Sequence, residues 1–113
     1  MANEPRPIAY TPEFKRNVRT LAKKYHHIQS DVQPVIEKIQ RGELIGDQVQ
    51  GTGYTILKVR IRNSDVSRGK SGGYRAIYYL KTLPAVVFVT IYSKTEQSDI
   101  SSAKIKKILS EFG

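Results

Sequence analysis

The 113-residue sequence predicts an α+β fold in which two N-terminal helices pack on a four-stranded, mostly antiparallel sheet with a C-terminal helix. Three observations lead to this prediction. Apolar residues recur at helical spacing in two segments before residue 42, three strand-like segments follow between residues 54 and 92, and helical spacing returns after residue 100. A short apolar segment at the start adds one more strand. The predicted element order is βααβββα, in a single domain spanning residues 1–113.

The first two elements are a strand and a helix. Residues 6–10 predict a short strand, which we expect at an edge of the sheet beside the last strand. Thr11-Pro12-Glu13 predicts a helix start. The threonine hydroxyl can cap the helix, and proline is tolerated in the first turn because a backbone N–H there has no partner within the helix. An acidic residue in the first turn interacts favourably with the helix dipole. The apolar stripe that follows is Phe14, Val18, Leu21, Ala22 and Tyr25.

A second helix follows a turn at His26-His27, two histidines that we interpret as surface or capping residues. Pro34 fits this helix only in its first turn, so we expect the helix to begin near Ser30 or Asp31. Gly42 is the expected C-cap. The apolar stripe of this helix is Val32, Val35, Ile36 and Ile39.

Three strands and a last helix complete the chain. In residues 54–62, apolar side chains alternate with Lys58, Arg60 and Arg62, which predicts one core face and one basic face. Residues 74–81 alternate in the same way, and residues 85–92 are apolar on both faces, which is typical of a central strand. Ser101 or Ser102 is the expected cap of the last helix, whose stripe is Ile105, Ile108, Leu109 and Phe112.

Composition excludes several classes of protein. No apolar run approaches the roughly 20 residues of a membrane-spanning helix, and the first residues show no secretory signal, so we expect a cytoplasmic protein without membrane contact. The chain has no cysteine and only two adjacent histidines. We therefore expect no disulfide, no metal site, no cofactor and no Ser-His-Asp catalysis.

Basic residues are concentrated in the middle of the chain. The sequence has 19 Lys and Arg against 10 Asp and Glu, a formal net charge of +9 and a pI near 9.9. Between residues 58 and 75 only Asp65 is acidic, whereas six residues are basic: Lys58, Arg60, Arg62, Arg68, Lys70 and Arg75. A row of cations on a rigid strand suits a phosphate backbone, so the pattern favours a nucleic acid as partner.

These residues also have other interpretations. Net charge also serves solubility, and basic side chains also protect edge strands from aggregation. The glycines around Lys70 lack the spacing of a phosphate-binding loop and do not lead from a strand into a helix. Most tyrosines occupy periodic core positions, but Tyr78 or Tyr92 would stack on a base if exposed.

The sequence resembles the RelE/ParE superfamily of type II toxins, and within it the RelE and HigB-like mRNA interferases. Four segments carry the resemblance: YTPEF at residues 10–14, KVRIR at 58–62, RGKSGGYRAIYYL at 68–80 and VTIYSKTEQSDIS at 89–101. The segments follow the same order of elements along nearly the whole chain. The resemblance implies a RelE-like fold and a toxin that is silenced by a cognate antitoxin.

The resemblance also implies an activity. Such toxins cut mRNA in the ribosomal A site without a metal, by attack of the RNA's own 2′-OH on the adjacent phosphate. Lys58 and Arg60 match the paired basic residues of the family and Arg75 matches the arginine at the scissile phosphate, while Arg62 continues the row. Arg68 and Lys70 belong to the HigB-like form of the preceding loop.

Two positions depart from the RelE pattern, because Thr95 and Ser101 stand where an arginine and a tyrosine are usual. Lys94 then becomes the candidate acid, and Tyr78 or Tyr92 the candidate stacking residue. Two other functions stay open. One is a ParE-like gyrase inhibitor without enzymatic activity, and the other is an inactive basic module that binds RNA or the ribosome.

Overall fold

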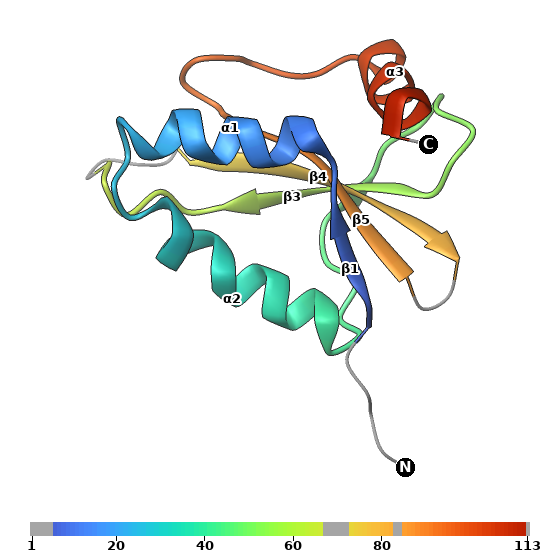
Figure 1. Ribbon diagram of the computed structural model, residues 1–113, viewed down its shortest axis with the longest axis horizontal. Coiled ribbons are helices and arrows are strands. Elements are labelled where there is room, and N and C mark those ends of the chain that lie inside the picture. Colours follow the sequence, from blue (N-terminus) through green and yellow to red (C-terminus); the bar gives the residue numbers. More distant parts are fainter. Residues whose placement is uncertain (1–5, 67–72, 83–84, 113) are drawn as a thin grey trace.

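The sheet has five strands in the order β1-β5-β4-β3-β2, and not the predicted four. The computed structural model describes residues 6–66, 73–82 and 85–112 (Figure 1). In chain order the elements are β1 (Ile8–Tyr10), α1 (Pro12–Ala22), α2 (Ile28–Gln40), β2 (Asp47–Gln48), β3 (Ile56–Ile61), β4 (Tyr74–Thr82), β5 (Ala85–Ser93) and α3 (Ser102–Phe112). The α+β class is confirmed, but the order of elements is βααββββα.

The additional strand, β2, pairs antiparallel with β3 at the edge of the sheet. Sequence patterns missed it because two exposed polar residues show no alternation. Gly46 lets the chain approach β3 closely. Its φ is +113°, and a Cβ at this position would lie 2.5 Å from the carbonyl oxygen of Lys58.

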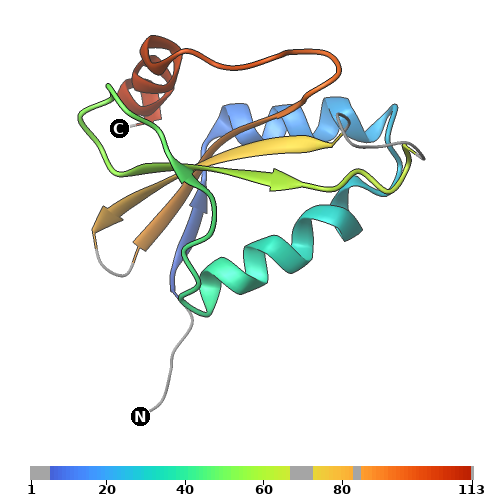
Figure 2. The same ribbon diagram turned by 180° about the vertical axis from the view of Figure 1, so that it is seen from behind.

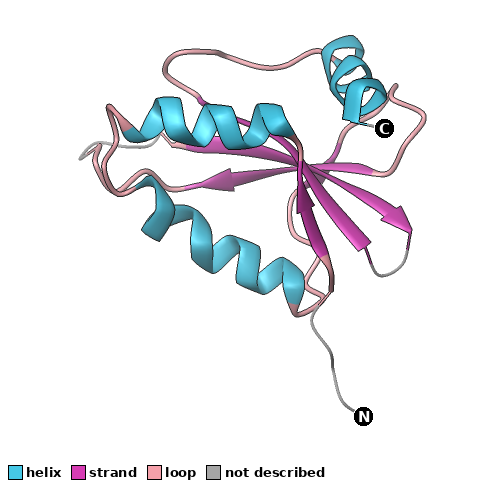
Figure 3. Ribbon diagram, viewed as in Figure 1, coloured by secondary structure: helices cyan, strands magenta, loops and turns pink. Residues whose placement is uncertain are grey.

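The remaining strand pairing follows the prediction. β3, β4 and β5 form an antiparallel meander, and β1 pairs in parallel with β5 at the other edge. β5 therefore lies between two strands and is buried along nearly its whole length, as its apolar composition predicts. Figure 3 shows how strongly the strands twist across one another.

The helix ends confirm most of the predicted caps. Thr11 caps α1 through its hydroxyl, which accepts a hydrogen bond from the Phe14 N–H at 3.0 Å. Ser101 caps α3 in the same way, with the Lys104 N–H at 3.1 Å. The expected C-cap of α2 is one residue too late: Arg41 is the C-cap, and Gly42 follows it with a φ of +101°.

The predicted start of α2 is wrong. The helix begins at Ile28 and not near Ser30 or Asp31, so Pro34 lies inside the helix, where it is exposed and donates no backbone hydrogen bond. Two distant contacts explain the earlier start. Ile28 is fully buried, and the backbone N–H of His27 donates to the Asp65 carboxylate at 2.9 Å.

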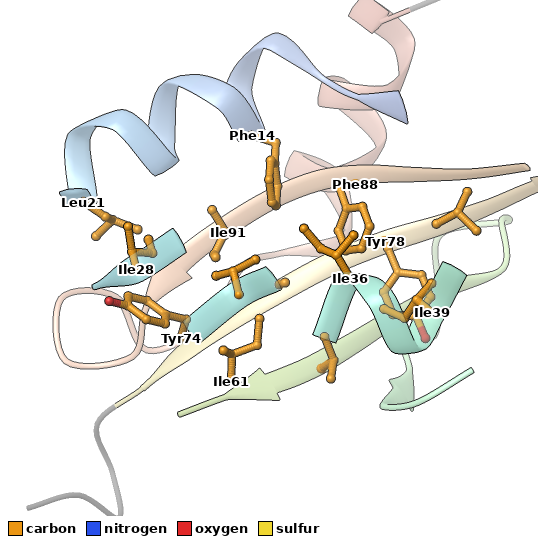
Figure 4. Close-up of a cluster of buried hydrophobic side chains, with 14 of the residues drawn as sticks. Phe14, Leu21, Ile28, Ile36, Ile39, Ile61, Tyr74, Tyr78, Phe88 and Ile91 are labelled. Atoms are coloured by element: carbon orange, nitrogen blue, oxygen red, sulfur yellow. The ribbon is translucent and has the colours of Figure 1, made fainter. Parts of the chain in front are cut away.

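The larger core fills the space between the sheet and the two N-terminal helices (Figure 4). It includes the predicted stripe residues Phe14, Leu21, Ile36 and Ile39, with Val18 partly buried against it. These side chains pack on the apolar face of β3, β4 and β5. Burial of this apolar area is the main force that holds α1 and α2 to the sheet.

A smaller core lies on the opposite face of the sheet, under α3. Figures 1 and 2 show α2 and α3 on opposite sides of the strands. The six buried members of this core are Ile56, Ile77, Val89, Ile105, Ile108 and Leu109. α3 covers only this part of the face. The neighbouring stretch of β3 and β4 lies beyond α3 and carries the basic residues.

Where β5 extends past its pairing with β1, its edge is covered by α1. The Thr11 hydroxyl donates to the Val89 carbonyl at 2.6 Å, and the Asn17 side-chain amide donates to the Ile91 carbonyl at 3.1 Å. The helix thus supplies donors that a neighbouring strand would otherwise supply. This leaves β5 without an open edge at the end of the sheet where the basic residues lie.

Candidate functional site

Three side chains form a row across the centre of the sheet. Arg60 on β3 lies opposite Arg75 on β4, and Arg75 lies opposite Tyr92 on β5. Residues opposite each other in an antiparallel pair share one face of the sheet. Lys58 lies two residues from Arg60 on the same face, and we call these four residues the basic face.

The alternation of β3 separates the basic face from the larger core. Val59 and Ile61 point into that core, whereas Ile56 on the other face is buried beneath α3. Lys58 and Arg60 share the face of Ile56 but lie beyond it along the strand. As a result Arg60 is exposed, while Lys58 and Arg75 are half-buried.

Gly73 brings β4 close to the end of β3 just before Arg75. Its φ is +98°, and a Cβ there would lie 2.8 Å from the carbonyl oxygen of Ile61. Its own carbonyl accepts a hydrogen bond from the Lys94 N–H at 2.9 Å. The glycine therefore joins β3, β4 and the residue after β5 at the border of the basic face.

The arginines of this region are not neutralised within the described part of the chain. Neither Arg60 nor Arg62 has an ion-pair partner there, and Arg75 donates only to the carbonyl of its neighbour Tyr74, at 3.3 Å. Like charges directly opposite each other on a sheet repel. An anion that binds between them would relieve this repulsion.

Lys58 is the exception on this face, because it has an acidic partner. Its Nζ lies 3.1 Å from Oδ1 of Asp99, a residue of the loop between β5 and α3. Sequence reasoning did not select Asp99. In the sequence, Asp99 is marked only as an acidic residue within a segment that carries the family resemblance. Nothing in that segment indicates that its partner is Lys58, 41 residues away.

Asp99 also contacts Tyr92. The Tyr92 hydroxyl donates to the same Oδ1 at 3.4 Å, and the Ile100 N–H donates to it at 2.8 Å. The Ile100 N–H and the Lys58 ammonium hold the pKa of the Asp99 carboxyl below its usual range. Burial raises the pKa of Tyr92 to about 12, and the neighbouring Asp99 adds to that shift while Arg75 opposes it.

Neither candidate stacking tyrosine is exposed. Tyr92 retains 6% of its accessible surface, and Tyr78 is fully buried, with its hydroxyl donating to the Ile45 carbonyl at 2.6 Å. Tyr78 lies on the face of β4 that points into the larger core (Figure 4). A tyrosine can stack on a base only if its ring is exposed, so neither residue fits this role.

Lys94 follows β5 at the border of the basic face. Its Nζ donates to the Ser98 carbonyl at 2.6 Å, so the side chain is directed along the same loop that carries Asp99. Arg68 and Lys70 lie outside the described residues. Of the residues selected from the sequence, the structure thus brings together Lys58, Arg60, Arg75 and the buried Tyr92.

A comparison with known families identifies the chain. Residues 11–111 match the RelE family, described as the RelE toxin of the RelE / RelB toxin–antitoxin system. The chain belongs to the RelE toxin family. It is therefore a toxin of a toxin–antitoxin system, and membership of the family implies a RelB-type antitoxin as its partner.

Two general properties bear on what this toxin binds. Among the described residues, no group of three or more His, Asp and Glu side chains is placed to hold a metal ion. No helix in the same part of the chain is long and apolar enough to cross a lipid bilayer. The basic face offers guanidinium, ammonium and phenol groups, and the Asp99 carboxylate lies beside them.

Proposed function

We propose that this toxin is a metal-independent endoribonuclease that cuts mRNA in the ribosomal A site. One observation carries the proposal: Arg60 and Arg75 lie directly opposite each other, and neither has an ion-pair partner in the described part of the chain. Two adjacent guanidiniums suit a phosphodiester, because each presents N–H groups in the geometry of phosphate oxygens. Membership of the RelE toxin family supports the same activity.

The proposed reaction is an intramolecular transfer within the RNA. The 2′-oxygen of one nucleotide attacks the adjacent phosphorus, a new 2′-O–P bond forms, and the P–O5′ bond breaks. The 2′-OH proton passes to a base of the protein, and an acid of the protein protonates the leaving 5′-oxygen. The products are a 2′,3′-cyclic phosphate and a free 5′-OH, so neither water nor a metal ion is needed in this step.

Each basic residue selected from the sequence has a proposed role. Arg75 binds the scissile phosphate and stabilises the negative charge that develops in the transition state. Lys58 and Arg60 line the 2′-OH side, and Lys58 is the base because an ammonium group releases its proton more readily than a guanidinium. Lys94 is the acid that protonates the 5′-oxygen, and Arg62, Arg68 and Lys70 bind the phosphate backbone.

The proposed partners are the ribosome with its mRNA, in the cytoplasm, and an antitoxin with an acidic segment. Such a segment would complement the net charge of +9 and accelerate the encounter. We expect the association rate with the antitoxin to fall as salt concentration rises. A salt-independent rate would argue against an acidic binding segment.

The decisive experiment is to induce the toxin in cells and map the 5′ ends of mRNA. We expect new ends within codons and in frame, and we expect the purified toxin to cut mRNA only on ribosomes, leaving a cyclic phosphate. Intact message together with DNA-damage signalling would instead identify a gyrase inhibitor. Intact message with ribosome binding alone would identify an inactive binding module.

A further inference from the structure

The loop between β5 and α3 places one carboxylate on the basic face. It runs from Lys94 to Ser101, and Figure 1 shows it passing from β5 along the sheet to α3. Within it, Asp99 is the residue whose side chain contacts both Lys58 and Tyr92. Resting on the proposed function, we propose that Asp99 is the positioning residue that directs Lys58 toward the 2′-OH beside the scissile phosphate.

The first argument is geometric. Lys58 lies on β3 and Tyr92 on β5, with β4 between them. Neighbouring strands are about 4.8 Å apart, so a group that contacts both side chains must lie across β4. β4 is the strand that carries Arg75. Asp99 therefore draws the Lys58 ammonium toward the centre of the face and toward Arg75.

The second argument concerns how the carboxylate itself is held. Oδ1 accepts three hydrogen bonds, from Lys58 Nζ at 3.1 Å, from the Tyr92 hydroxyl at 3.4 Å and from the Ile100 N–H at 2.8 Å. The buried ring of Tyr92 and the backbone of Ile100 are both fixed by the fold. The flexible partner is Lys58, so the arrangement orients the lysine and not the reverse.

The loop is also braced around Asp99. The Gln97 side-chain amide donates to the Asp99 carbonyl at 2.9 Å, and Lys94 Nζ donates to the Ser98 carbonyl at 2.6 Å. Two backbone N–H groups of the turn, from Glu96 and Gln97, donate to the Ser93 carbonyl. The carboxylate is thus presented by a structured turn on the end of β5.

The third argument separates positioning from simple blockage of the site. A carboxylate that acted as a substitute for RNA phosphate would pair with the arginines as well. Within the described residues Asp99 forms an ion pair with Lys58 alone, which leaves Arg60, Arg62 and Arg75 available to an incoming phosphate. The Asp99 side chain is 66% exposed, so this ion pair contributes little to folding.

The test compares Asp99→Asn with Glu96→Gln, using the purified full-length toxin and ribosome-bound mRNA. Glu96 is a matched control because it lies in the same loop but contacts Lys24 and Tyr25, away from the basic face. We expect Asp99→Asn to lower kcat about 10- to 100-fold, the usual cost of a misplaced catalytic group, with KM changed less than twofold. Glu96→Gln should retain the parent values, and Asp99→Glu should recover part of the lost rate.

A second measurement does not depend on cleavage. The Lys58 ammonium signal, assigned by its absence in Lys58→Ala, reports side-chain order by NMR. We expect Lys58 to be more ordered in the parent toxin than in Asp99→Asn, and equally ordered in the parent and Glu96→Gln.

Three results would overturn the positioning role. They are tighter RNA binding by Asp99→Asn with unchanged kcat, an equal loss of rate in Asp99→Asn and Glu96→Gln, or a Lys58 that is equally mobile with and without Asp99. If the parent toxin leaves mRNA intact, the proposed function fails, and the order of Lys58 alone then decides whether Asp99 positions it.

Discussion

Arg60 on β3 lies directly opposite Arg75 on β4, so two guanidinium side chains share one face of adjacent strands. The pair is unfavourable in the free protein, because like charges opposite each other repel. It persists because Val59 and Ile61 hold β3 in register through the core on the other face. The register that buries these apolar residues therefore assembles an anion-binding pair.

Arg75→Ala should lower the rate of mRNA cleavage on ribosomes on the order of 10²- to 10³-fold, because one donor to the transition state is lost. Lys81→Ala is the matched control. It removes an exposed cation from the same face of the same strand, about 20 Å away along β4. Single-turnover cleavage at saturating toxin is the measurement. Equal rates for Arg75→Ala and the parent would remove Arg75 from the site.

Arg62→Ala should weaken binding to single-stranded RNA and reduce the slope of log K against log salt by about 1. The reason is that one phosphate contact, and the counterion it displaces, are lost. Lys38→Ala removes the same charge from α2, whose helix packs on the opposite side of the sheet, and should leave the slope unchanged. Fluorescence anisotropy over a series of salt concentrations measures both. An equal decrease of the slope in the two variants would mean that RNA binding depends only on the net charge of the protein and not on where the charges lie.

The contact between His27 and Asp65 predicts a pH dependence of stability. Nδ1 of His27 lies 2.6 Å from the Asp65 carboxylate, which raises the pKa of the histidine, and the histidine in turn lowers the pKa of Asp65. The histidine's contribution is complete below its unfolded pKa and is lost as pH rises through its raised folded pKa. The carboxylate's contribution is lost as pH falls through its lowered folded pKa.

The stabilisation by this pair is therefore greatest between about pH 4 and pH 6.5, the two unfolded values. We expect the Tm difference between the parent and His27→Gln to shrink as pH rises from 5.5 to 8.5. His26→Gln serves as the control and should show a smaller change with pH, because His26 is exposed and acts on Asp65 only through its charge, more weakly than His27 does. A constant Tm difference across this range would contradict the assignment.

Tyr78→Phe should destabilise the fold by about 1 kcal/mol, because the Ile45 carbonyl loses a partly buried hydrogen bond of 2.6 Å. Burial raises the pKa of this tyrosine to about 12, consistent with a structural phenol. Tyr79→Phe, on the other face of β4, should cost less than about 0.5 kcal/mol. Urea unfolding gives both values. The rate of cleavage per folded molecule should not change, and a specific loss of rate in Tyr78→Phe would restore a functional role.

Most of the fold follows from local patterns in the sequence. Thr11-Pro12 sets the start of α1, Gly42 ends α2, and the apolar run of β5 places that strand inside the sheet. These features were predictable because each depends on residues within one turn or one strand. The start of α2 and the strand β2 were not predictable, because they depend on contacts with Asp65 and with β3.

The sequence by itself determined the basic face, since the alternation in β3 separates Lys58 and Arg60 from the core side chains. Only the tertiary structure decided which groups meet on that face. The strand register set Arg60 against Arg75, and the loop after β5 brought Asp99 to Lys58 across 41 positions. Tyr78 and Tyr92 are buried for a similar reason, because other segments of the chain cover them. Periodicity assigns a residue to a face, but its exposure depends on which distant segment covers that face.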